Sequence, residues 1–568
     1  MLMGVRARRA ASTAGTSLDS VVGRFGWPVL LLSAALLFQL MLSLVMIRGA
    51  WLTADPLYYI TERGALPGSD EGLLASHRGH WLSVPFLLYR VLFPLFGLSQ
   101  GWPYSLVSLL LHLSVVVMLF ASLRRASWGS GMAAVTVVPV VFLGAGAQAY
   151  ISDHPLPLLL SLALGLAALL QFSIDASRVR VATGAVLLLL AVMSSGVGLV
   201  VLVTTTVWLL LRRGLRAAIM GTAPAGLAFL TWFAAFGRDY DRVRLEGWDI
   251  LALPKLAWVG ATTALERASG VPDSGALLLC LLVGAPLLLR SLPREARDLA
   301  WAGQVGALAQ LILSAIGGGP EGYPPVTESR YAYVALVLLA PSVAVLVHAA
   351  RRAGPRLPRG APLVLSGVLA TTYLLNALDL QRHEADAFVS VSSGLRDRVV
   401  GTLAANKAGE RVLTARSNGL DERMNVKLVT SKRVAWTLPG EPADARQRLE
   451  AESEFFVGVS PDTFGLFAPR PAVSVSFDQP LLPGKACAPY RTVSDHPEIA
   501  VDTGGGVEIA VKSPSTQVTT RLERNQRVST SRTWDVASGT PVHIATTASD
   551  ARLVVSFDRA GEYTICKH

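Results

Sequence analysis

Charged residues are scarce in this chain. Only 16% of its 568 residues are Asp, Glu, Lys or Arg, whereas a soluble globular protein carries about a quarter. Hydrophobic residues make up 52%, and the mean hydropathy is +0.46. This composition excludes a disordered chain and an ordinary soluble enzyme.

Cysteine is also rare, with three residues in the whole chain. Their spacing contains no zinc-ligand pattern. Cys280 lies in an apolar run, where we expect a small buried hydrophobe. Cys487 and Cys566 lie in the more polar C-terminal part, and an oxidising exterior would allow a disulfide between them that ties back the last strand.

Motifs for nucleic-acid and nucleotide recognition are missing. The formal net charge of +11, taken alone, would suggest a nucleic-acid partner. However, the chain has no basic patch interleaved with aromatic residues, no P-loop and no Gly-rich phosphate fingerprint. A Ser/His/Asp hydrolase motif is absent as well. We therefore expect no nucleic-acid partner.

Long apolar runs fill the first two-thirds of the chain. A membrane-spanning helix needs roughly 20 apolar residues. The run 181–211 is too long for one span and is interrupted at 194–196, which predicts two short helices. With this pair the chain has about eleven transmembrane helices, and the other runs are 27–47, 102–123, 132–147, 156–172, 217–236, 276–289, 299–316, 331–348 and 362–378.

Arginines in alternate loops predict the topology. The positive-inside rule places these basic loops in the cytoplasm, provided that the apolar run 81–98 does not cross the membrane. We therefore predict an interfacial helix there. The prediction is a multi-pass protein of the plasma or inner membrane, with a cytoplasmic tail (1–24), a transmembrane domain (25–380) and an extracytoplasmic domain (381–568).

The C-terminal part is long enough for a domain with its own core. A helical segment around 386–407 precedes short alternating runs that are punctuated by turn residues, the pattern of a β-rich, sandwich-like or α/β domain. The clearest runs are 411–414, 472–477, 507–511, 541–546 and 552–557. The expected fold is thus a polytopic α-helical membrane protein followed by a β-rich extracytoplasmic domain.

The outward loops contain the candidate functional residues, because ionisable groups beside membrane helices are often functional. Asp55 follows the first span, and Asp153 with His154 precedes a later one. Each acid could be a general base, or could simply cap a helix. The two acids could also share a divalent metal.

A cationic candidate lies in a later outward loop. Arg330 could hold a phosphate bidentately, or could only extend its side chain to the membrane interface. Other candidates for substrate binding are Tyr58, His77, Arg78, His80, His154 and Glu328.

The chain resembles the GT-C superfamily of membrane glycosyltransferases, which use polyprenyl-phosphate-linked sugars and include protein O-mannosyltransferases and aminoarabinose transferases. The resemblance covers about residues 25–380. It rests on "ADPLYY", "LLASHRGHWLSVPFLLYRVLFPLFGL", "LLLLAVMSSGVGLVVLV" and "TESRYAYVALVLLAP". It implies Asp55 as catalytic base, Asp153 as a second acid and Arg330 as the partner of the lipid phosphate. Many members carry two adjacent acids at the first position, whereas this chain has Ala54 and Pro56 around Asp55.

The expected activity is inverting transfer of a hexosyl or pentosyl group from a polyprenyl-phosphate sugar to a cell-envelope glycan or protein, beside membrane lipids. A non-catalytic cell-envelope assembly or polymer-binding protein on the same scaffold is one alternative. A transporter or lipid flippase is another, which the few charges within the spans and the absence of a convincing repeat disfavour.

Overall fold

The computed structural model divides the chain into two compact units. The first comprises Met1–Ala50, Glu71–Val91 and Gly101–Ser390, and the second comprises Trp51–Asp70, Leu92–Gln100 and Val391–His568. The residues that the structure describes are 26–63, 72–77, 79–174, 177–237, 247–288, 292–317, 327–353, 361–407, 457–460, 475–476, 487–492, 498–502, 507–512, 517–529, 531–535, 541–546, 548, 551–558 and 561–567.

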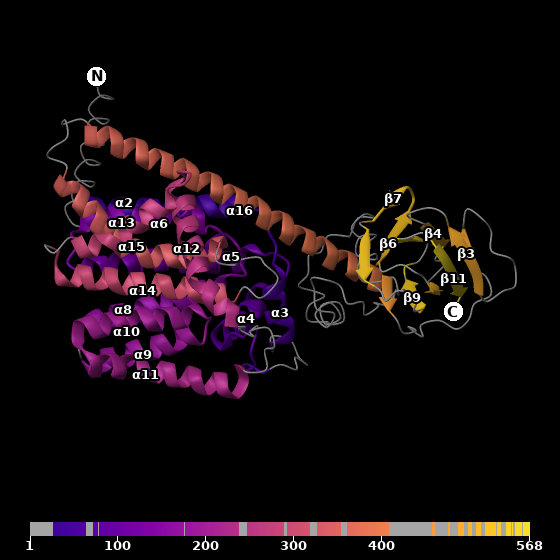
Figure 1. Ribbon diagram of the computed structural model, residues 1–568, viewed down its shortest axis with the longest axis horizontal. Helices are drawn as coiled ribbons and strands as arrows, with labels where there is room; N and C mark the ends of the chain where they lie inside the picture. The colour runs from indigo at the N-terminus through magenta and orange to yellow at the C-terminus, as the bar shows by residue number, and fades with distance from the viewer. Residues whose placement is uncertain are drawn as a thin grey trace, which may run out of the picture. The chain divides into compact units, whose positions relative to one another are not determined.

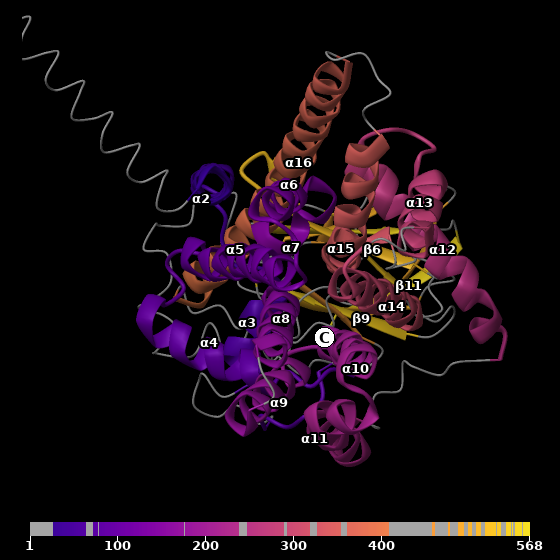
Figure 2. The same cartoon turned by 90° about the vertical axis from the view of Figure 1, so that its left-hand side faces the viewer.

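The first unit is a bundle of helices that run side by side (Figure 1). Viewed along the bundle, α14 and α15 stand near its centre, and α2, α4, α11 and α12 stand at its rim (Figure 2). Its helices, of which α4 and α16 continue into the second unit, are α2 (Trp27–Met46), α4 (Ser83–Phe96), α5 (Trp102–Arg125), α6 (Ser130–Val141), η1 (Gly144–Gly146), α7 (Gln148–Ile151), α8 (Leu156–Ile174), α9 (Arg178–Val192), α10 (Val197–Arg213), α11 (Leu215–Trp232), η2 (Phe233–Gly237), α12 (Gly247–Ser269), α13 (Gly275–Leu288), α14 (Arg294–Ile316), α15 (Ser329–Ala353) and α16 (Ala361–Lys407).

Each run predicted to span the membrane coincides with helical structure, which confirms a polytopic helical protein. In the described part of the chain, six helical stretches are long and apolar enough to cross a bilayer: α2, α5, α8, α11 with η2, α14 and α15. Helix α4 has 14 residues and is about 21 Å long, and like α6 and α13 it is one of the shorter apolar helices. Its interfacial position stays a prediction.

Two interruptions shape the bundle. The predicted one separates α9 from α10, and Gly198 there lies so close to Val192 that a side chain would collide with it. The other was not predicted: the run 132–147 ends as a helix at Val141 and continues through η1. A Cβ atom at Gly146 would lie 2.7 Å from Cβ of Tyr333, so the chain passes that point only with glycine.

Side chains satisfy the carbonyl groups that the second interruption exposes. His112 Nε2 lies 3.1 Å from the carbonyl oxygen of Val141, and Tyr333 OH lies 2.8 Å from His112 Nδ1. The Tyr150 hydroxyl donates to Leu143 O (3.3 Å), and the Tyr373 hydroxyl donates to Pro139 O (2.6 Å). Because a hydrocarbon core would supply no water, such partners are what permit non-helical backbone within the predicted span 132–147.

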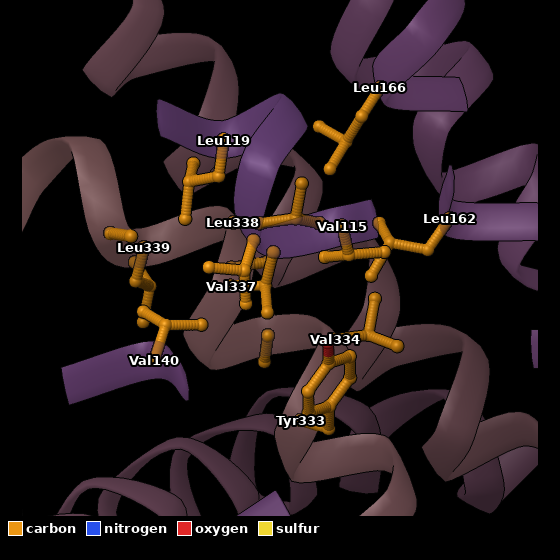
Figure 3. Packing of buried hydrophobic residues seen from close by; sticks show 14 of the residues in the cluster. Val115, Leu119, Val140, Leu162, Leu166, Tyr333, Val334, Val337, Leu338 and Leu339 are labelled. Atoms are coloured by element: carbon orange, nitrogen blue, oxygen red, sulfur yellow. The ribbon is translucent and has the colours of Figure 1, made fainter. Parts of the chain in front are cut away.

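The bundle core consists of interdigitated leucine and valine side chains. Val115 and Leu119 of α5 meet Leu162 and Leu166 of α8 and a run of residues on α15 (Figure 3). Lipid tails are as apolar as leucine, so close packing rather than water exclusion holds such helices together. Small residues accordingly mark the tightest approach, where Gly303 of α14 faces the carbonyl of Leu338 in α15.

The prediction for Cys280 is wrong: this residue is exposed rather than buried. It lies on α13, where the neighbouring Leu277 and Leu281 are exposed as well. This face of the helix points away from the bundle, so its apolar character suits lipid instead of a protein core.

The second unit contains two antiparallel sheets, as the strand pattern predicted. One has the order β1-β9-β5-β11-β3, and the other has β2-β4-β10-β6-β7 with β8 paired to β6. The strands are β1 (Val457–Ser460), β2 (Val475–Ser476), β3 (Cys487–Thr492), β4 (Glu498–Asp502), β5 (Val507–Lys512), β6 (Gln517–Arg524), β7 (Arg527–Val528), β8 (Arg532–Asp535), β9 (Pro541–Thr546), β10 (Arg552–Phe557) and β11 (Gly561–Lys567).

Local patterns account for these strands. Along β6 the buried residues Val518, Thr520 and Leu522 alternate with less buried ones, which is the two-residue period of a sheet with one packed face. Asn525 and Gln526 both have positive φ angles (49° and 65°), the conformation of a tight hairpin, and link β6 to β7. The run 411–414 lies outside the described residues, and the helical segment around 386–407 is the end of α16.

Strand β11 pairs with β3, and Cys566 is the register partner of Cys487. Directly opposed residues of an antiparallel pair have Cβ atoms about 4.5–5.5 Å apart, near the separation that a disulfide needs. The register thus suits the predicted disulfide, which itself stays a prediction.

The close contact between α14 and α15 at Gly303 gives the first testable prediction. Gly303→Ala should lower the free energy of unfolding by about 1–3 kcal/mol, because the new methyl group collides with the carbonyl of Leu338. Gly284→Ala on α13 is the matched control, since no heavy atom lies within 4 Å of its Cβ position. Thermal unfolding in detergent compares them, and equal effects of the two substitutions would contradict the packing argument.

Peptide mapping without reductant tests the disulfide. We expect a cross-linked peptide containing Cys487 and Cys566, with Cys280 as the one thiol that maleimide labels in the unreduced chain. Cys487→Ser should then expose a second thiol and destabilise the domain by about 2–4 kcal/mol. Three labelled thiols in the unreduced wild-type protein would show that the bond is absent.

Candidate functional site

The first-loop acid lies in the second unit. Asp55 is half-buried in the first turn of α3 (Ala54–Glu62), where a carboxylate interacts favourably with the helix dipole. The guanidinium of Arg63 lies over the ring of Tyr58, 5.4 Å from its centroid. Trp51 precedes this helix and donates from Nε1 to Leu98 O at 2.6 Å.

Two buried charges at the end of α3 were missed. Glu62 and Arg63 are only 2% and 1% exposed, although they follow the apolar stretch directly and read as a solvated loop in the sequence. Charged groups are rarely buried to this degree unless they have partners. Periodicity gives no sign of this burial, because the helix ends at these residues.

In the first unit, the second-loop acid is fully buried. Asp153 follows α7, and its carbonyl oxygen accepts from the backbone N–H of Leu156, where α8 begins (3.2 Å). The same oxygen lies 3.5 Å from the hydroxyl of Tyr89. His154 is held through Nδ1 by the hydroxyl of Ser152 at 3.1 Å. Asp153 is therefore a fixed group at the start of a span.

Two hydrogen bonds connect this loop to the start of α15. The backbone N–H of Gln148 donates to Ser329 Oγ (3.3 Å), and the N–H of Arg330 donates to Gln148 Oε1 (3.4 Å). These bonds join the segment that precedes Asp153 to the start of α15. The common site predicted for Asp55, Asp153 and Arg330 stays a prediction.

Arg330 has a neighbouring acid as its partner. Its Nη2 lies 2.6 Å from Oε2 of Glu328, and its guanidinium lies 5.0 Å from the ring centroid of Tyr331. The side chains of Arg330 and Glu328 are 27% and 40% exposed, so an anion can reach the pair. A phosphate that binds Arg330 has to compete with the carboxylate of Glu328.

The first-loop histidines form part of a turn that packs on the helix break. His77 and His80 exchange backbone hydrogen bonds (3.1 and 2.9 Å), and Gly79 has a φ angle of 80°. The His80 ring lies against Gly196, where a Cβ atom would be 3.1 Å from Nδ1. The N–H of Val84 donates to Met193 O (3.2 Å). Arg78 lies outside the described residues.

Stacked tryptophans fix the same loop to α11. The rings of Trp81 and Trp232 are parallel, with centroids 5.3 Å apart. Trp232 Nε1 donates to Leu74 O (2.8 Å), and Ser83 Oγ donates to Leu73 O (2.7 Å). The loop is thereby held at the end of the bundle where α10 begins.

Sequence reasoning also missed Glu384. This residue lies on α16, six positions beyond the predicted span 362–378, and was assigned to the C-terminal domain. Burial raises the pKa of its carboxyl group, while Arg267 at 3.8 Å and a hydrogen bond from Ser329 oppose that shift. The residues between 378 and Glu384 continue the helix of the predicted span. This continuity is the one sequence signal that could have assigned Glu384 to the helical unit.

The expected divalent metal stays a prediction. Among the residues described, no group of three or more His, Cys, Asp and Glu side chains is arranged to hold a metal ion. The two acids named for the site, Asp55 and Asp153, belong to different units.

No protein-family model and no curated protein matches the chain. Among solved structures, it is similar to ArnT from Cupriavidus metallidurans bound to undecaprenyl phosphate, with 14% identity, a TM-score of 0.44, and coverage of 77% of this chain and 92% of ArnT. It is also similar to the archaeal oligosaccharyltransferase AglB from Archaeoglobus fulgidus in complex with an inhibitory peptide and a dolichol-phosphate. That match has 13% identity and a TM-score of 0.40, and covers 66% of this chain and 58% of AglB.

The oligosaccharyltransferase of A. fulgidus in the apo form gives a third match, with 13% identity, a TM-score of 0.43, and coverage of 76% and 69%. Likeness at this level concerns the path of the chain alone, so the function is argued below from the residues of this protein.

The buried carboxyl group gives a prediction on pH. Since the pKa of Glu384 is raised in the folded protein, the folded state holds this proton more tightly than the unfolded state does. Stability from this group is present at low pH and is lost as pH rises above about 4, where an unfolded Glu ionises. Glu384→Gln should therefore gain stability relative to wild type between pH 4 and pH 8.

Melting temperatures across this range measure the difference. Asp386→Asn is the control, because this acid lies on the same helix and its side chain is 75% exposed. A difference between wild type and Glu384→Gln that does not grow with pH would rule out the buried-acid interpretation.

Proposed function

We propose that this protein transfers a sugar from a polyprenyl-phosphate donor to an extracytoplasmic acceptor in the cell envelope. The observation that carries the proposal is the pair of hydrogen bonds at Gln148, one donated and one accepted, which joins the loop of the buried Asp153 to that of Arg330. A buried acid and an accessible cation beside one membrane surface are suited to a substrate that has a hydroxyl group and a lipid phosphate.

The orientation follows from the arginines. The N-terminus and the loops rich in arginine face the cytoplasm, and the β-sheet domain faces outward. The candidate residues then lie at the outer membrane surface. The polyprenyl tail lies among the helices near α4, whose exposed Leu87, Val91 and Leu95 suit the interface.

Arg330 binds the phosphate of the donor. Its guanidinium exchanges Glu328 for two phosphate oxygens, a bidentate contact that arginine makes better than lysine. Displaced Glu328 remains beside the sugar, where its carboxylate can accept from a sugar hydroxyl. His80, whose ring lies against Gly196 between α9 and α10, is the second group that could bind the phosphate.

Asp55 acts as the general base. Its carboxylate takes the proton of the acceptor hydroxyl while that oxygen attacks the anomeric carbon, and the bond between this carbon and the phosphate oxygen breaks. The anomeric configuration is inverted in this single displacement. The lipid phosphate leaves with its negative charge, which Arg330 stabilises. Asp153 orients the acceptor, and the β-sheet domain guides a polymeric acceptor or docks a partner.

A non-catalytic role on the same scaffold is the second candidate. It is favoured by Ala54, which stands where many related enzymes have a second acid, and by the ion pair that already engages Arg330. Such a protein would bind the donor lipid without releasing polyprenyl phosphate.

The decisive experiment uses wild type and Asp55→Asn in proteoliposomes with polyprenyl-phosphate hexoses and pentoses. We expect wild type to release polyprenyl phosphate, and Asp55→Asn to be slower by about 10²–10⁴-fold with donor binding kept, since a base is removed without loss of shape.

Asp273→Asn is the matched control, because this exposed acid has a φ angle of 58°, which Asn tolerates. Full turnover by Asp55→Asn would remove Asp55 from the mechanism. Donor binding without turnover in wild type would support the non-catalytic alternative.

A further inference from the structure

Arg267 contacts the segment that leads into Arg330. It lies in the last turn of α12, and it was not among the residues that the sequence predicted for the site. Its Nη1 donates to the carbonyl oxygen of Thr327 (3.1 Å), and its Nη2 lies 3.8 Å from Oε1 of Glu384 on α16. A guanidinium is a planar fork whose nitrogens point in fixed directions, so one side chain connects α16 to the start of α15.

Ser329 continues these contacts toward Arg330. Its hydroxyl group donates to the carboxylate of Glu384 and accepts from the backbone N–H of Gln148 at 3.3 Å. The side chain of Gln148 in turn accepts from the backbone N–H of Arg330 at 3.4 Å. The contacts thus run from α12 through α16 to α7 and the first turn of α15 without a gap.

Helix α16 holds Arg267 at two points. Asn376 Nδ2 donates to the carbonyl oxygen of Arg267 at 2.8 Å, and Glu384, eight residues further along α16, meets its guanidinium. Eight residues are about 12 Å of helix, so the backbone and the side chain of Arg267 are attached about two turns apart. Gly270 follows α12 with a φ angle of 69°, and a Cβ atom there would lie 2.8 Å from Cγ of Asn376. The end of α12 is therefore fixed on α16.

The side-chain contacts of Arg330 are all local. Its partners are Glu328 and the ring of Tyr331, which belong to the same short stretch of chain and move with it. These contacts orient the guanidinium within the stretch but do not fix the stretch on the bundle. The side chains of Arg267 and Glu384 are 34% and 19% exposed, so water screens their attraction less than that of a fully exposed pair.

We propose that Arg267 and Glu384 are positioning residues for Arg330: they hold the segment 327–330 against α16 and α7, so that the guanidinium of Arg330 is in place before a lipid phosphate binds. Neither residue touches the donor. The inference rests on the proposed function, since it takes Arg330 as the phosphate ligand. Loss of the pair should weaken phosphate binding although no contact to the phosphate is removed, because ordering the segment then has to occur during binding.

A double-mutant cycle tests whether Glu384 acts through Arg330. Calorimetry on the full-length protein in detergent measures binding of farnesyl phosphate, a short polyprenyl phosphate. Arg330→Gln should lower the affinity by about 10–100-fold, since charge-assisted hydrogen bonds are lost. Glu384→Gln should lower it on the order of tenfold through displacement of the binding group. In the Arg330→Gln background the same substitution should change it by less than about twofold. Equal factors in both backgrounds would overturn the positioning role.

Matched variants separate positioning from folding. Glu384→Gln is expected to be at least as stable as wild type between about pH 4 and pH 8, so its lower affinity would not reflect unfolding. Arg267→Gln should lower the affinity equally, and the double variant no further, because both substitutions remove the same pair. Asp386→Asn, in an exposed pair with Arg382 on the same helix, is the control and should bind as wild type does. Wild-type affinity in Glu384→Gln would contradict the proposal.

Amide hydrogen exchange distinguishes failure of this inference from failure of the proposed function. If wild type does not bind farnesyl phosphate, or if Arg330→Gln binds it unchanged, the proposed function is wrong and exchange in the segment 327–332 decides the positioning role. Exchange in Glu384→Gln should be faster than in wild type and Asp386→Asn on the order of tenfold, because the segment has lost its attachment to α16. Equal exchange in the three proteins would overturn the inference.

Discussion

The arrangement of the bundle depends on how backbone polar groups are satisfied where the helices are interrupted. Lipid offers no hydrogen-bonding partners, so a helix that ends inside the membrane-crossing region needs side chains to complete its bonds. The interruption after Val141 has such partners in His112, Tyr150 and Tyr373. The Val141 carbonyl can only accept, so the imidazole presents its N–H at Nε2 to this oxygen, and in the neutral ring Nδ1 accepts from the Tyr333 hydroxyl.

The two interruptions also supply the candidate site. The one after Val141 lets the chain form α7 and carry Gln148 to the start of α15, with Asp153 just beyond. The one between α9 and α10 provides Gly196, against which the His80 ring packs, and Met193, whose carbonyl oxygen accepts from the N–H of Val84. Breaks in the helices therefore position loop residues that would otherwise be held only by a flexible chain.

Local sequence patterns decided which structural features could be predicted. The Ser-Ser-Gly interruption at 194–196 predicted the pair α9 and α10, and alternation predicted β9 and β10 with their observed bounds. The interruption after Val141 escaped prediction because its cause is distant: Gly146 approaches Tyr333, nearly two hundred positions later. The burial of Glu384 and the exposure of Cys280 were not predicted for a related reason. A single sequence does not show which face of a helix packs against protein.

The arginines at the two ends of the bundle have different partners. At the start of α15, Arg330 is paired with the single carboxylate of Glu328, and both side chains are partly exposed. On the other side, Arg212 is held by Glu295 and Asp298, so it orients its neighbours rather than exchanging partners. The arginines that predict topology through their number thus acquire distinct local roles from the acids beside them. Counting positive charges predicts the orientation of the helices, whereas the placement of the acids shows how each arginine is paired.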